Sequence, residues 1–185
     1  MSTPVSDYQG VTPHLIVRDA KAAIEVYKNA FGAEVVNVYE GPEGRVWFSE
    51  LTLNGGRVIV SDEFPEFGVV SPATLGGPSV TLHMYVDNSD DAVGRAIAAG
   101  LQAPWGVKDM HWGDDYSQLD DPFGHKWSLA TRRVNYSQDE LDAKHEHFYD
   151  QYKHEIARAG QYADEWAAAH PKARRPNVPP VPGDL

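Results

Sequence analysis

Apolar residues along this chain follow a pattern that occurs twice. Residues 11–17 (VTPHLIV) are matched 69 positions later by residues 80–86 (VTLHMYV). Both runs are short and rich in apolar and β-branched residues, which predicts two β-strands. Each strand leads into a residue suited to capping a helix, Asp19 in the first copy and Asn88 in the second.

A helical pattern follows each predicted strand. Apolar side chains recur at helical spacing within residues 20–31, and Gly32 can end this helix. The same stripe occurs within residues 92–97, before Gly100. The pattern therefore predicts a strand and then a helix in both halves of the chain.

Each half also ends in a predicted β-hairpin. Residues 51–60 carry Asn-Gly-Gly at the turn, a sequence that favours tight turns between strands. Residues 119–128 form the counterpart of this hairpin. Here the repeat spacing is 68 positions instead of 69, because the second half has lost one residue before this point. Two unrelated strand–helix units could match by chance, but the order of motifs and the turn chemistry agree throughout.

These repeats predict an α+β fold built from two βαβββ modules. The first module covers residues 1–65 and the second covers residues 79–132, with a Gly- and Pro-rich linker at 66–78. A helical arm is expected over residues 133–170, because a capping box begins at Ser137 and an apolar stripe follows. Residues 171–185 contain five prolines and are expected to be an extended or mobile tail.

The arm is expected to be structural and to cover its own domain or a dimer partner. A lid over a cavity and a scaffold that acts through the arm are the alternatives. His145 and His147 lack the four-residue spacing of a helical zinc motif. We therefore expect them to be surface histidines on a solvated helix.

Charge and composition exclude several functions. The net charge of −11 disfavours nucleic acid and anionic membranes as partners, because binding to them uses clustered Lys and Arg. The chain has no cysteine, which excludes disulfides, thiolate nucleophiles and Cys-based metal sites. It shows neither a signal-peptide pattern near its start nor a run of 18 apolar residues. A cytoplasmic protein is therefore expected.

Four segments together resemble the vicinal-oxygen-chelate superfamily, which includes glyoxalase I, bleomycin-resistance proteins and extradiol dioxygenases. They are residues 11–17, 22–33, 109–116 and the Asp-Pro-Phe-Gly-His sequence at 121–125. Their style is most similar to the PhnB-like branch, and the resemblance covers roughly residues 9–131. It implies two modules in a curved mixed sheet around one cavity, and a homodimer.

The resemblance also implies where a metal would be bound. Metal-dependent relatives place ligands on the first and last strands of each module, which correspond here to Thr12, Val60, Thr81 and Ser128. None of these is a good ligand for a divalent metal, and Val60 has no donor atom. We therefore predict no metal at the usual positions, which argues against glyoxalase I or dioxygenase activity, and we predict no cofactor.

Strand alternation predicts which side chains face the implied cavity. If Thr12 points inward, so does His14, and by the repeat the same holds for their counterparts. Trp127 should instead pack beneath a helix, whereas Val60 should share the cavity face with Ser128. The predicted ligand-binding residues are Thr12, His14, Phe48, Glu50, Thr81, His83, Tyr85, Trp112, Tyr116, Gln118 and Ser128.

Three interpretations of this face remain open. His14 and His83 could hydrogen-bond or stack against an organic ligand in an aromatic pocket. With Glu50 they could instead form a displaced divalent-metal site, with Gln118 as a weak fourth ligand. They could also simply satisfy one another, with no ligand.

The first interpretation predicts a metal-independent protein that binds a small molecule. An enzyme is the alternative: a lyase or isomerase with a displaced metal, or with Glu50 as general base and a histidine as acid. A non-catalytic scaffold is the third class. The sequence leaves open whether the protein is an enzyme.

Overall fold

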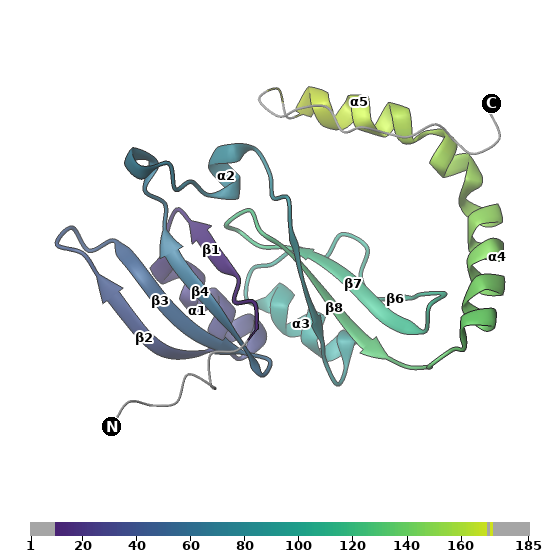
Figure 1. Ribbon diagram of the computed structural model, residues 1–185, viewed down its shortest axis with the longest axis horizontal. Helices are drawn as coiled ribbons and strands as arrows, with labels where there is room; N and C mark the ends of the chain where they lie inside the picture. Colours follow the sequence, from purple (N-terminus) through teal and green to yellow (C-terminus); the bar gives the residue numbers. More distant parts are fainter. Residues whose placement is uncertain (1–9, 170, 172–185) are drawn as a thin grey trace.

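The computed structural model describes residues 10–169 and 171, except the side chains of 151, 152, 154–157, 159 and 160. The basic residues of the predicted tail lie outside the described residues. Two similar modules lie next to each other, and a helical arm follows them (Figure 1). The first module comprises β1 (His14–Val17), α1 (Ala20–Phe31), β2 (Glu34–Glu40), β3 (Val46–Leu53) and β4 (Gly56–Asp62). The second comprises β5 (Thr81–Tyr85), α3 (Ser89–Ala98), β6 (Lys108–Asp109), β7 (Asp114–Asp120) and β8 (Lys126–Arg132).

The two modules have the same strand topology. The strand order is β1-β4-β3-β2 in one sheet and β5-β8-β7-β6 in the other. In each sheet the first strand pairs parallel with the last, and the remaining pairs are antiparallel. The prediction of an α+β fold with two βαβββ modules is therefore confirmed. The sheets are open, and in the described residues no strand of one sheet pairs with a strand of the other.

The predicted helix signals act as expected. Asp19 caps α1 by accepting a hydrogen bond from the Ala22 amide at 2.9 Å, and Asn88 caps α3 by accepting one from the Asp91 amide at 3.1 Å. Gly32 ends α1 with φ of 69°, a left-handed conformation in which a side chain would be strained. The helices thus begin and end where the sequence pattern indicates.

Each sheet packs one face against its helix and leaves the other face open. Leu15, Val17 and Met84 are buried in the core, whereas His14 and His83, which alternate with them, are exposed. This is the alternation that a half-buried strand requires. Trp127 is 2% exposed and lies in the core, as predicted.

A buried carboxylate joins the two modules. Asp121 Oδ2 accepts hydrogen bonds from the Tyr27 hydroxyl of α1 at 2.7 Å and from Trp127 Nε1 of β8 at 3.0 Å. The rings of Tyr27 and Trp127 meet edge to face at 5.2 Å. Burial, and then the negative charge of Asp121, raise the pKa of Tyr27 well above its usual value. Next to this joint, α1 packs along α3 behind the sheets (Figure 1).

The predicted linker is ordered by polar contacts. It contains a 3₁₀ turn, η2 (Pro65–Phe67), and a short helix, α2 (Pro72–Leu75). Glu63 accepts hydrogen bonds from the Ser71 amide and hydroxyl at 3.0 and 2.7 Å and from the Thr74 hydroxyl at 2.8 Å. These contacts fix the linker against the end of β4.

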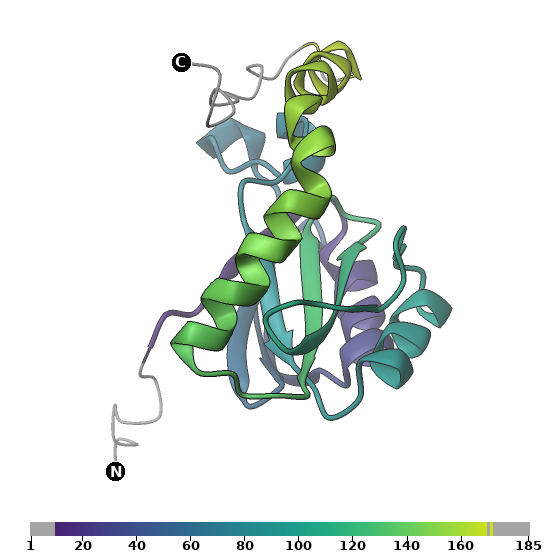
Figure 2. The same cartoon turned by 90° about the vertical axis from the view of Figure 1, so that its right-hand side faces the viewer.

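The arm consists of two helices, α4 (Gln138–Ala157) and α5 (Ala159–Ala169). The capping box forms as predicted, since Glu140 accepts from the Ser137 amide at 2.8 Å and the Ser137 hydroxyl accepts from the Glu140 amide at 3.4 Å. α4 runs across the open side of the second module (Figure 2). Within the described residues, no helix is long and apolar enough to cross a membrane.

Candidate functional site

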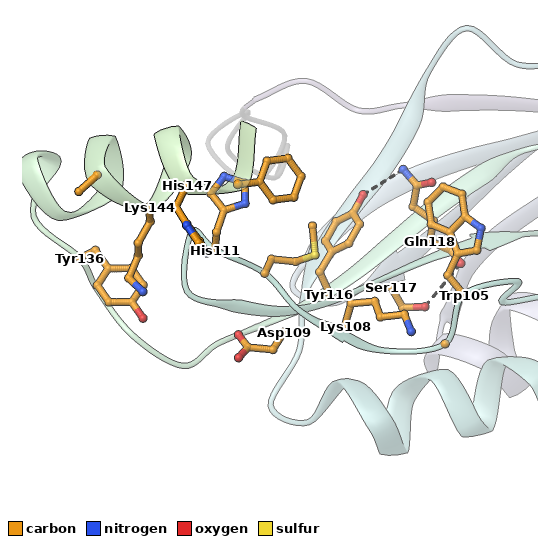
Figure 3. Close-up of a pocket in the computed structure, with 14 residues that line it drawn as sticks. Trp105, Lys108, Asp109, His111, Tyr116, Ser117, Gln118, Tyr136, Lys144 and His147 are labelled. Atoms are coloured by element: carbon orange, nitrogen blue, oxygen red, sulfur yellow. Dashed lines mark hydrogen bonds between the residues drawn. The ribbon is translucent and has the colours of Figure 1, made fainter. Parts of the chain in front are cut away.

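A pocket of about 860 Å³ lies between the second sheet and α4 (Figure 3). This volume is within the range of about 300–1,000 Å³ that is usual for small-molecule sites. One wall comes from β6, β7 and the loop before β6, and the other comes from the arm. The lining residues are Trp105, Gly106, Lys108, Asp109, Met110, His111, Tyr116, Ser117, Gln118, Tyr136, Ala143, Lys144, His147 and Phe148.

Strand alternation creates the sheet wall. Tyr116 and Gln118 are two residues apart on β7, so their side chains share the open face, and Gln118 Nε2 donates to the Tyr116 hydroxyl at 3.2 Å. Lys108 of β6 pairs directly with Tyr116 and therefore shares this face. Trp105, which is 63% exposed, lies near Gln118 in Figure 3.

Helical spacing creates the arm wall. Lys144, His147 and Phe148 lie three and four residues apart on α4, so they project from one side of the helix. Lys144 places its ammonium 4.6 Å from the centre of the Tyr136 ring. The arm therefore contributes both charge and aromatic surface to the pocket.

His111 of the second module contacts two residues of the arm. Its ring stacks on Phe148 at 4.2 Å between centroids, and His145 Nδ1 lies 3.4 Å from His111 Nε2. Burial, and then the positive charges of His145 and Lys144, lower the pKa of His111 from its usual 6.5. The neutral form of His111 is thus the form that suits the docked arm.

The pocket adjoins most of the second-module residues that the sequence predicted. Tyr116 and Gln118 line it. His83 stacks on Tyr116 at 6.1 Å, and its Nδ1 is 2.8 Å from the Ser128 hydroxyl. Trp112 meets Tyr116 edge to face at 5.7 Å. His83 and Trp112 therefore contact the ring of Tyr116, and Ser128 holds His83.

Tyr85 and Trp112 are held by a buried aspartate. Asp114 is 2% exposed and accepts hydrogen bonds from the Tyr85 hydroxyl at 3.2 Å and from Trp112 Nε1 at 3.0 Å. Arg132 forms an ion pair with the same carboxylate at 2.5 Å. The predicted binding residues Tyr85 and Trp112 are therefore engaged with Asp114 and do not line the pocket.

The predicted residues of the first module lie on the other sheet. His14, Phe48 and Glu50 are on its open face, and none of them lines the pocket. His14 Nε2 is 3.0 Å from the Ser61 hydroxyl, and burial lowers the pKa of His14 from its usual 6.5. Thr12 and Thr81 are exposed. Within one chain, the structure does not bring His14 and His83 together.

Glu50 is committed to a partner. It is 6% exposed, forms an ion pair with Nη1 of Arg57, and accepts a hydrogen bond from Asn37 Nδ2 at 3.4 Å. Both carboxylate oxygens are thus occupied by side chains of the same sheet. This arrangement leaves the carboxylate poorly placed to take a proton from a substrate.

The predicted residues do not form a divalent-metal site within the described part of one chain. In the described part of the chain, no group of three or more His, Asp or Glu side chains is arranged to hold one. The proposed displaced ligands His14 and Glu50 lie on one sheet, and His83 lies on the other. At the usual positions, Val60 is buried in the apolar core.

The predicted face of Val60 is wrong, and a turn explains the error. Ser128 pairs with His83, whereas His14 pairs with Ile59. Four residues, 53–56, lie between the paired Thr52 and Arg57 of the first hairpin, whereas five, 121–125, lie between the equivalent pair Asp120 and Lys126 of the second. The extra residue changes the repeat spacing from 68 to 69, and a shift of one residue reverses the face of a strand. Ile59 therefore takes the open-face position.

The arm side of the pocket was not predicted from the sequence. His147 was expected on a solvated surface, yet it lines the cavity, and His145 contacts His111. Their spacing from Phe148 on one helix gave a signal that they share a face. Nothing in the linear pattern indicated that this face meets the second sheet.

Comparisons with known proteins agree with the fold. Residues 11–129 match the model of the Glyoxalase/Bleomycin resistance protein/Dioxygenase superfamily. An uncharacterized protein of Mycobacterium bovis is 37% identical over 136 residues, which span 72% of this chain and 90% of that protein. The match to the family model ends before α4, so the arm wall lies outside it.

Solved structures show the same architecture. A gene product from Arabidopsis thaliana aligns with a TM-score of 0.52 and 27% identity, over 66% of this chain and 98% of that chain. A PhnB protein from Bacillus cereus aligns with a TM-score of 0.53 and 21% identity, over 66% of this chain and 99% of that chain. With the family model matching well over half of its length, this chain belongs to the glyoxalase/bleomycin resistance/dioxygenase superfamily.

Proposed function

We propose that this protein binds a small organic molecule, without metal or cofactor, in the pocket between the second sheet and α4. The observation that carries the proposal is a cavity of about 860 Å³ with aromatic rings on both walls. Ligand sites of this size combine apolar surface with a few polar groups that fix orientation. Here Tyr116 and Phe148 supply the apolar surface, and Gln118 and His147 supply polar groups.

Preorganised side chains support a binding role. Tyr116 is held by His83, Trp112 and Gln118, and Phe148 is held by His111. Rings that are already fixed lose little conformational entropy when a ligand binds. The arm, in this proposal, is a wall of the site as well as a structural cover.

The proposal contains no catalytic step. Glu50, the candidate general base, is paired with Arg57 on the other sheet and does not line the pocket. A scaffold without a ligand is also less well supported, because the space between β7 and α4 is not filled by side chains of the described residues.

We also propose that the protein is a cytoplasmic homodimer in which a second copy covers the open face of the first sheet. In the described chain, α4 covers only the second module (Figures 1 and 2). Tyr39, 64% exposed, and Phe48 form a ring pair at 6.3 Å on the uncovered face. Light scattering should give twice the mass of the chain for the native protein and a monomer for Tyr39→Arg; a native monomer would overturn this assignment.

Titration calorimetry with three naphthalene probes tests the binding function: 2-naphthoate, 2-naphthalenemethanol and 2-naphthylmethylammonium. At least one probe should bind, and Tyr116→Ala should weaken that binding about tenfold or more, since aromatic contacts dominate such sites. Tyr162→Ala, at an exposed position of α5 outside the pocket lining, is the matched control and should leave the affinity unchanged. Failure of all three probes to bind, or equal losses in both variants, would contradict the proposal.

A further inference from the structure

The charged side chains of the pocket indicate the class of its ligand. We propose that the pocket takes a flat aromatic molecule that carries a carboxylate. This inference rests on the proposed binding function and adds the sign of the ligand's charge to it. It depends on Lys108 and Lys144, which line opposite walls.

These two lysines differ from the other lysines that the structure describes. Lys21, Lys28, Lys126 and Lys153 each form an ion pair with a carboxylate. Neither Lys108 nor Lys144 has an ion-pair partner among the described residues. The chain carries 27 acidic residues against 16 Lys and Arg, so partners for a lysine are plentiful. Two ammonium groups without an ion pair, of which that of Lys144 lies over the Tyr136 ring, are therefore a distinctive feature of this cavity.

The acidic residues close to these lysines in the sequence form no ion pair with them. Glu140 lies one turn before Lys144, but its Oε2 accepts hydrogen bonds from the amide and hydroxyl of Ser137, both at 2.8 Å. Asp109 also lines the cavity, but it follows Lys108 on β6, so its side chain leaves the other face of the strand, where it is exposed and forms no ion pair with Lys108. Neither carboxylate neutralises the lysine beside it by an ion pair.

Neutral donors reinforce the positive charge. His147 and the amide of Gln118 line the same cavity, and both can donate a hydrogen bond to an oxygen atom. A carboxylate only accepts hydrogen bonds, so it matches ammonium, imidazole and amide donors together. An ammonium ligand would instead share the cavity with two positive charges.

The aromatic lining requires a flat ligand body. Trp105 and Tyr116 lie towards the sheet side of the pocket and His111 lies towards the arm side (Figure 3), where Phe148 of α4 stacks on it. Rings on two walls form favourable stacked or edge-to-face contacts with a planar aromatic group. A free inorganic anion or a flexible acyl chain would use the lysines without using these rings.

The three naphthalene probes separate this inference from the proposed function. In calorimetry at low ionic strength, 2-naphthoate should bind about tenfold or more tightly than 2-naphthalenemethanol, and 2-naphthylmethylammonium should bind least. Salt should weaken the binding of 2-naphthoate, because exposed charges are screened. Lys108→Gln and Lys144→Gln should each reduce its affinity about tenfold, as expected for one charge-assisted contact.

Lys126→Gln is the matched control, because it removes the same charge from a neighbouring strand whose lysine is paired with Asp120. It should leave the affinity for 2-naphthoate within about twofold of the native value. Equal affinities for the acid and the alcohol, or tighter binding of the ammonium probe, would overturn the inference while leaving the binding function intact. Equal losses in all three lysine variants would also overturn it. If none of the probes binds, both the function and the inference fail.

Discussion

The two modules share a fold but differ in what their open faces carry. In the first module the buried Glu50 is paired with Arg57, and no arm covers the sheet. In the second, Gln118 takes the position of Glu50, and α4 lies over the sheet, with two lysines that form no ion pair in the pocket lining. A duplicated framework can thus keep its core while the chemistry of its uncovered faces changes, because close packing constrains the core and not these faces.

The largest expected effect comes from the joint between the modules. Asp121→Ala removes a buried carboxylate that accepts hydrogen bonds from Tyr27, Trp127 and the amides of Phe123 and His125. We expect the free energy of unfolding to fall by about 3 kcal/mol, because several buried donors lose their partner at once. Urea denaturation followed by tryptophan fluorescence measures this change.

The adjacent Asp120 provides the control for that experiment. Its ion pair with Lys126 is exposed, so Asp120→Ala should cost less than about 1 kcal/mol. Similar losses in the two variants would show that Asp121 does not join the modules in the way described.

A smaller effect is expected where the arm meets the second module. Phe148→Ala removes the ring that stacks on His111 and leaves the two sheets untouched. The affinity for 2-naphthoate should fall about tenfold, or roughly 1.4 kcal/mol, with little change in Tm. Calorimetry and thermal melts measure the two quantities, and Tyr149→Ala, which changes the next residue on α4, is the control. A loss of Tm without a loss of affinity would place Phe148 outside the site.

Acidification should loosen the arm but not the first module. The pKa of His111 is lowered in the docked state. As pH falls, His111 therefore binds a proton more readily when the arm is undocked. Docking is therefore fully favourable above the ordinary value of 6.5 and weakens as pH drops from there through the lowered pKa. Hydrogen exchange of the α4 amides, corrected for intrinsic rates, should speed up several-fold between pH 7.5 and pH 5.5.

Two variants test whether His111 is responsible for this pH dependence. His111→Phe keeps the stacking on Phe148 and should remove the pH dependence of exchange in α4. The pKa of His14 is also lowered by burial, but His14 lies in the first module, so His14→Phe should preserve that pH dependence. Loss of the pH dependence in His14→Phe, with its retention in His111→Phe, would contradict the assignment to His111.

The smallest effect is expected at the predicted general base. Glu50→Gln should leave 2-naphthoate affinity within about twofold of the native value, because Glu50 lies on the other sheet and is paired with Arg57. Calorimetry on the variant measures this directly. A large loss would mean that the first module takes part in binding, as it would if a second copy brought its open face to the pocket.

Strand alternation indicated which side chains share the open face of the second sheet. Tyr116 and Gln118 line the pocket, and His83 and Ser128 lie beside them on the same face, because period-two alternation holds along an unbroken strand. It failed at Val60, where one extra turn residue in the other hairpin changed the register. The helical pattern of the arm also gave a wrong expectation for His147, because the solvated and docked faces of a polar helix have similar patterns.

The two modules, their helix caps, most core faces of their strands and the absence of thiol chemistry could all be predicted from the sequence. These features depend on local spacing and on residue type, both of which can be read along the chain. Three other features are visible only in the folded chain: α4 lies over β7, Glu50 is paired with Arg57, and Lys108 and Lys144 line one cavity. Such contacts join residues that are distant in sequence, and no periodicity within one element records which surface its exposed face will meet.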